Sequence, residues 1–184
     1  MILQKKSRSD KIALSLNEVL KEIRYRNVLK GPYDCVLFVA GNPYRSDDGV
    51  GPYIAGRLAP FLSGIPRIHL INANTTPENF VDEVIRISPE FLVILDAADF
   101  KKDPGEFIFL DDEKDLPKNT ISTHTLPLNL IASLIRSECS CSIIYIGIQI
   151  GDIWPGECLS KDVRKAADLF IQEITHLMAG NMDA

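Results

Sequence analysis

The chain lacks several features that would assign it quickly to a functional class. Its four cysteines form neither a CxxC pair nor a zinc-binding spacing, so we interpret them as buried or incidental thiols. No apolar run is long enough to cross a membrane, and the N-terminus lacks the apolar centre of a signal peptide, which predicts a soluble, cytoplasmic protein without membrane insertion. The net charge is −5 and no long basic run lies within the predicted elements, so nucleic acid is not an expected partner.

Common nucleophile and phosphate-binding motifs are also missing. No G-x-S-x-G elbow precedes a predicted helix, which argues against a serine hydrolase. The G-x-x-x-x-G-K motif is absent, and the glycine-containing turn at residues 41–49 carries two acids where a phosphate would bind, so electrostatics disfavour a nucleotide.

The pattern of apolar residues predicts an α/β fold. At 184 residues the chain suits one domain with a substantial core. Five apolar runs predict strands, and segments with helical spacing separate them; the strands are expected at 36–40, 67–71, 91–95, 106–110 and 142–150. We therefore expect a single three-layer domain with a mostly parallel, twisted five-stranded sheet flanked by helices on both faces.

The first 32 residues differ from the remainder in charge. Residues 1–32 carry eight Lys or Arg against three acids, a net +5, whereas residues 33–184 carry twelve against twenty-two, a net −10. Apolar residues at mostly helical spacing predict an amphipathic helix from Asp10 to Lys30. We interpret residues 1–32 as an N-terminal helical extension of an α/β domain at 33–184. Its charge would let it dock on that acidic body, the favoured interpretation, or on a partner.

Two acids and a histidine carry the chemical hypothesis. Asp48 lies in the turn after the first strand, beside Asp47, and both acids could cap the following helix. Asp96 directly follows the third strand, and His124 precedes a later helix. If the first and third strands are neighbours, both acids lie at one edge of the sheet, where α/β proteins bind ligands, and the loop carrying His124 could reach them.

Two carboxylates and one imidazole can hold a divalent transition metal and leave coordination positions open for chemistry. Spacing alone leaves other roles open: Asp48 as a helix N-cap, Asp96 as a carboxylate that organises a loop, and His124 as a turn residue bonded to the backbone.

Several motifs, in order and spacing together, resemble those of a known family. They are Gly41-Asn42, Asp47-Asp48-Gly49-Val50-Gly51-Pro52, Pro77-Glu78-Asn79, Asp96-Ala97-Ala98-Asp99, Pro104-Gly105-Glu106, Thr123-His124-Thr125-Leu126-Pro127-Leu128, Gly147-Ile148-Gln149 and Leu159-Ser160. Between Val36 and Ile174 the chain resembles the hydrogenase maturation endopeptidases, which trim the C-terminus of the large subunit of nickel-iron hydrogenases. Some members of the family carry glutamate where Asp48 stands. With aspartate at this position, the chain resembles the branch of the family that processes membrane-bound, hydrogen-evolving hydrogenases.

The resemblance implies a function, a partner and a site. Asp48, Asp96 and His124 would form the catalytic, metal-sensing set of an endopeptidase that removes the C-terminal extension of a nickel-loaded large-subunit precursor. The nickel would arrive held by cysteines of the substrate, so no permanently bound cofactor is expected, and we expect a monomer or weak oligomer. The alternatives are a hydrolase with its own bound metal, such as zinc or manganese, and a hydrogenase assembly chaperone that does not cleave.

Overall fold

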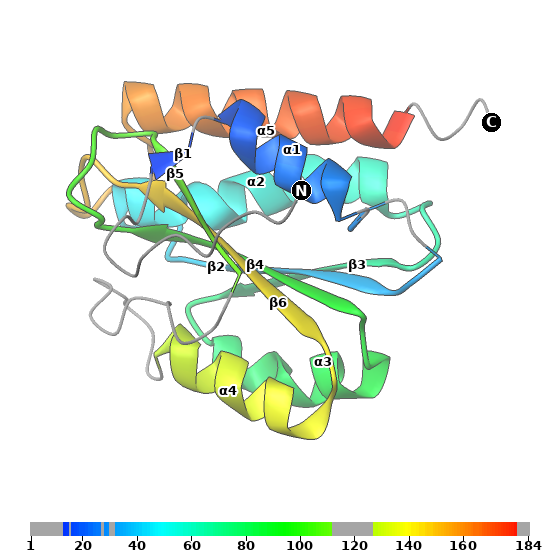
Figure 1. Cartoon of the computed structure of the whole chain (residues 1–184). Coiled ribbons are helices and arrows are strands. Elements are labelled where there is room, and N and C mark those ends of the chain that lie inside the picture. The colour runs from blue at the N-terminus through cyan, green and yellow to red at the C-terminus, as the bar shows by residue number, and fades with distance from the viewer. Residues whose placement is uncertain (1–12, 15, 27, 30–31, 112–126, 180–184) are drawn as a thin grey trace.

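The computed structural model describes residues 13–14, 16–26, 28–29, 32–111 and 127–179, which form a three-layer α/β fold (Figure 1). The strands are β1 (Ala13–Leu14), β2 (Cys35–Ala40), β3 (Ile68–Asn74), β4 (Phe91–Ala98), β5 (Phe107–Leu110) and β6 (Ser142–Gln149). The helices are α1 (Leu16–Tyr25), α2 (Val50–Leu62), α3 (Val81–Ile87), α4 (Leu128–Glu138) and α5 (Lys161–Ala179), with 3-10 turns η1 (Ser46–Gly49) and η2 (Pro77–Phe80). Among the described residues, no helix is long and apolar enough to span a bilayer.

The sheet has the order β1-β5-β6-β4-β2-β3. Strands β3, β2, β4 and β6 are parallel, and a helix lies in the connection from β2 to β3, from β3 to β4 and from β5 to β6; β5 pairs antiparallel with β6. The prediction of a mostly parallel five-stranded sheet covered on both faces is confirmed. The two-residue strand β1 adds a sixth strand by pairing with β5 at the outer edge.

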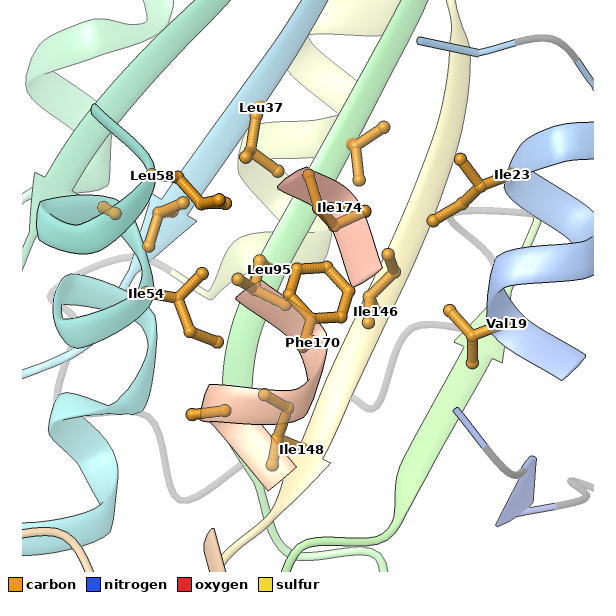
Figure 2. Packing of buried hydrophobic residues seen from close by; sticks show 14 of the residues in the cluster. Val19, Ile23, Leu37, Ile54, Leu58, Leu95, Ile146, Ile148, Phe170 and Ile174 are labelled. Atoms are coloured by element: carbon orange, nitrogen blue, oxygen red, sulfur yellow. The ribbon is translucent and has the colours of Figure 1, made fainter. Parts of the chain in front are cut away.

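One face of the sheet is covered by α1, α2 and α5 (Figures 1 and 2). Apolar side chains from these helices pack on every second residue of the central strands, as the alternation of a strand requires. Val19 and Ile23 of α1 are buried in this cluster, so the N-terminal helix packs on the domain itself. Arg26, just after α1, also pairs with Asp111 beyond β5 at 2.9 Å, joining the basic segment to an acid of the body.

The opposite face is covered by α3 and α4, which contact each other (Figure 1). Its core contains the alternate residues of the same strands, such as Phe38 of β2 and Ile94 of β4, together with Ile131 and Ile135 of α4. Tyr145 of β6 is the largest fully buried side chain among the described residues and belongs to this face.

The N-terminal helix and two strands, β3 and β4, differ most from the sequence-based expectation. Strand β3 ends at Asn74, three residues beyond its predicted end. The N-terminal helix was expected over Asp10–Lys30, but α1 covers only Leu16–Tyr25 and a strand precedes it. Strand β4 extends three residues past its predicted end, because β6 continues alongside it as far as Gln149. Asp96 therefore lies inside β4, paired in register with Gly147, and not beyond the strand.

Candidate active site

The turn after β2 fixes Asp48 tightly against the end of that strand. Gly41 has a φ of +141°, and a Cβ there would lie 2.2 Å from the carbonyl oxygen of Asp48, so only glycine fits. The backbone N–H of Asn42 donates to the Asp48 carbonyl at 3.0 Å, and the Asp48 N–H donates to the Arg45 carbonyl at 3.1 Å. These bonds close a compact loop in which the Asp48 residue is only 3% exposed.

The prediction that Asp47 or Asp48 caps the following helix is wrong. Both acids lie inside η1, and the N-cap of α2 is Gly49, which has no side chain to donate to or accept from the helix. Asp48 therefore does not occupy the N-cap position that was one alternative role for it.

Asp96 is buried in the final part of β4. Its residue is 1% exposed. Because Ile94 faces the α3/α4 core while Leu95 and Ala97 face the other core, alternation directs the Asp96 side chain to the α3/α4 face. Burial, and secondarily the negative charge of Asp96, raise the pKa of the Tyr145 phenol well above its usual value. Tyr145 lies opposite Ile94 on the neighbouring strand β6, so the Tyr145 and Asp96 side chains belong to the same face of the sheet.

The segments that carry Asp48 and Asp96 lie together. Strands β2 and β4 are hydrogen-bonded neighbours, as the convergence hypothesis required, with Val39 opposite Leu95. The turn η1, which contains Asp48, contacts β4. Two buried acids thus lie at the carboxyl edge of a parallel sheet, Asp48 in the turn after β2 and Asp96 in the neighbouring strand β4, and this edge is where α/β folds bind ligands.

His124, the third residue of the predicted set, lies outside the described residues. The described chain resumes at Pro127, and α4 begins at Leu128, which is buried in the α3/α4 core, the face to which Asp96 points. Within the described segments, no group of three or more His, Cys, Asp or Glu side chains is arranged to hold a metal ion. The histidine of β3, His69, lies at the opposite end of the sheet, 2.9 Å from Asp34.

Asp47 has a structural role that the sequence did not indicate. Its residue is fully buried, and its carboxylate accepts hydrogen bonds from the backbone N–H groups of Gly151, Asp152 and Ser160 at 2.6–2.8 Å and from the Ser160 hydroxyl at 2.8 Å. This carboxylate joins the turn after β2 to the loop between β6 and α5. The partners are more than 100 positions away in sequence, so no local pattern around Asp47 signalled this role.

Gln149 organises the loop that follows β4. Its side-chain oxygen accepts hydrogen bonds from the backbone N–H groups of Phe100 and Lys102, and its amide nitrogen donates to a carboxylate oxygen of Asp99 at 3.2 Å. The motifs around Asp96–Asp99 and Gly147–Gln149 are therefore one structural unit. Asp99 is a carboxylate that organises this loop, since it also accepts a hydrogen bond from the backbone N–H of Lys101 at 3.0 Å.

The chain is an α/β protein whose candidate active site lies at the carboxyl edge of its sheet. There the turn after β2 and the final part of β4 each carry a buried acid. The family model described as hydrogenase maturation protease (HycI) matches residues 53–177. A relative from Methanocaldococcus jannaschii whose name assigns it to the hydrogenase maturation proteases is 31% identical over 158 residues, covering 82% of this chain and 91% of its own. The Escherichia coli K12 hydrogenase 3 maturation protease is 28% identical over 142 residues, 76% of this chain and 87% of that protein.

The comparison with solved structures also finds hydrogenase maturation proteases. The crystal structure of the [NiFe] hydrogenase maturation protease HycI from Thermococcus kodakarensis matches with a TM-score of 0.73 and 30% identity, covering 85% of this chain and 99% of that one. The solution structure of the endopeptidase HycI from E. coli matches with a TM-score of 0.66 and 26% identity, over 76% of this chain and 87% of that one. The chain belongs to the hydrogenase maturation protease family and is a peptidase.

Proposed function

We propose that this peptidase removes the C-terminal extension of a nickel-loaded [NiFe]-hydrogenase large-subunit precursor. In this proposal Asp48, Asp96 and His124 contact nickel that the precursor already holds through its cysteines. The observation that carries the proposal is the burial of two acids, at 3% and 1% exposure, on adjacent strand ends of one sheet edge.

The ligand chemistry supports this assignment. Carboxylate oxygens and imidazole nitrogen bind divalent transition metals, and three such ligands leave room for the donors that a substrate brings. Carboxylates in a low-dielectric site attract a cation more strongly than carboxylates in water do. His124 stands three residues before Pro127 in sequence, the residue that precedes α4.

Contact with a substrate-held metal would make cleavage depend on assembly. A precursor without nickel would lack the cation that draws its tail onto the two acids, so only the loaded form would be positioned for cleavage. The peptidase would then act as a check that metal insertion has been completed.

The test compares nickel-loaded and nickel-free forms of candidate precursors, weighed by mass spectrometry after incubation with the purified protein. We expect loss of the extension only from the loaded form, and no loss with Asp48→Asn. A matched control is Glu138→Gln, which changes an exposed acid at the far end of α4. Equal cleavage of both forms would remove the nickel requirement, an intact loaded precursor would indicate a chaperone, and stoichiometric metal in the protein before substrate is added would indicate a resident metal.

A further inference from the structure

Two large aromatic side chains are exposed on the loops that border the candidate active site. Tyr44, in the turn between β2 and η1, is 68% exposed, and Trp154, in the loop between β6 and α5, is 75% exposed. Trp154 is the only tryptophan of the chain. Tryptophan and tyrosine are the residues most often found at the energetic centres of protein interfaces.

The two aromatic residues are carried on backbones that are bonded to each other. The N–H of Gly156 donates to the Tyr44 carbonyl at 3.0 Å, and the N–H of Ser46 donates to the Gly156 carbonyl at 2.7 Å. The Ser46 hydroxyl donates to the Trp154 carbonyl at 3.0 Å. The loops carrying Tyr44 and Trp154 therefore form one continuous rim, although 110 positions separate the two residues in sequence.

Each aromatic residue is also held locally. The Tyr44 N–H donates to the side-chain oxygen of Asn42 at 3.0 Å, and the Trp154 N–H donates to the carboxylate of Asp152 at 2.9 Å. Below them, the buried carboxylate of Asp47 binds the N–H groups of Gly151 and Asp152. The backbone at both positions is thus fixed while the rings stay in solvent, which lowers the entropic cost of binding a partner.

We propose that Tyr44 and Trp154 are docking anchors for the protein that delivers the metal, the hydrogenase large-subunit precursor. This inference rests on the proposed function for the identity of the partner, but not on the cleavage step. The rim is continuous with the site, because Tyr44 and Asp48 belong to the same closed turn. A folded protein that brings its metal to Asp48 must approach this edge of the sheet, so its surface covers the rim and removes both rings from water.

The single tryptophan allows a direct test. Protein labelled with 5-fluorotryptophan has one fluorine resonance, from Trp154. We would titrate labelled Asp48→Asn protein, which the proposed function makes inactive, with nickel-loaded precursor. We expect the resonance to shift or broaden with saturation. An unchanged resonance at saturating precursor would overturn the inference, as would the same change produced by raising the protein's own concentration, which would assign the rim to a second copy of this chain.

Kinetics give an independent test. Trp154→Ala and Tyr44→Ala are each expected to raise KM for the precursor by about 10-fold or more while kcat changes less than about twofold, and Trp154→Phe should restore most of the affinity. The matched control is Tyr33→Ala, which removes an exposed tyrosine at the other end of β2. Unchanged KM in both rim variants would overturn docking while leaving the proposed function intact. If wild-type protein cleaved no precursor, that function would fail, and the fluorine titration would still decide the docking.

Discussion

The two ends of the parallel sheet both carry acids, but in different environments. At the amino end, Asp34 precedes β2 and is bonded to Arg67 at 3.1 Å and His69 at 2.9 Å, with a third of its side chain exposed. At the carboxyl end, Asp47, Asp48 and Asp96 are 0%, 3% and 1% exposed. Burying a carboxylate costs free energy that an exposed pair avoids. The acids at the carboxyl end are therefore expected to have dedicated roles, whereas Asp34 takes part in an ordinary surface ion pair.

The largest effect should come from Asp48 and Asp96. Asp48→Asn and Asp96→Asn preserve side-chain shape but remove the negative charge, so each should lower the cleavage rate of nickel-loaded precursor on the order of 10³-fold. The check is single-turnover cleavage followed by mass spectrometry, with circular dichroism to verify the fold. Wild-type turnover in either variant would show that the carboxyl edge is no more functional than the amino edge.

Asp47 should affect stability more than any other acid in the described part of the molecule. Asp47→Ala leaves three backbone N–H groups and one hydroxyl without their acceptor, which should lower the free energy of unfolding by about 3 kcal/mol. Urea denaturation measures this loss. Asp47→Asn keeps one acceptor oxygen but turns an amide donor toward other donors, so we expect an intermediate loss. A change below about 0.5 kcal/mol in Asp47→Ala would contradict the structural role.

The tight turn that positions Asp48 can be tested through glycine. Gly41→Ala forces a side chain into a positive φ and against the Asp48 carbonyl, and should cost about 2 kcal/mol or more in folding free energy. Gly56→Ala is the matched control, because Gly56 lies within α2 with no atom within 4 Å of the position that a Cβ would take, and alanine there should stabilise by about 0.5–1 kcal/mol. Equal melting temperatures for the two variants would contradict the turn geometry.

Much of this architecture was predictable from local patterns. The apolar runs at 36–40 and 91–95 identified two central strands, and doubly wound order made them neighbours, so the placement of the turn that carries Asp48 beside β4, which carries Asp96, followed from the sequence. The length of β4 was not predictable, because it depends on how far β6 runs alongside it. The role of Asp47 was missed for a similar reason: its partners, such as Ser160, are brought to it only by the completed fold. His124 stays a prediction.

Substituting Asp34 should have the smallest effect on stability and activity. This result would set the amino end of the sheet apart from the carboxyl end. Hydrogen bonding to His69, together with the charges of Arg67 and His69, lowers the pKa of Asp34 below its usual value. A depressed folded-state pKa contributes stability that is present above the unfolded-state value of about 4 and is lost as the pH falls through the folded-state value. Asp34→Asn should therefore destabilise by less than about 1 kcal/mol at pH 7, and the difference from wild type should shrink below about pH 4. Urea denaturation at pH 7, 5 and 3 would measure this, and cleavage should be unchanged, because Asp34 lies at the end of the sheet opposite to the candidate active site.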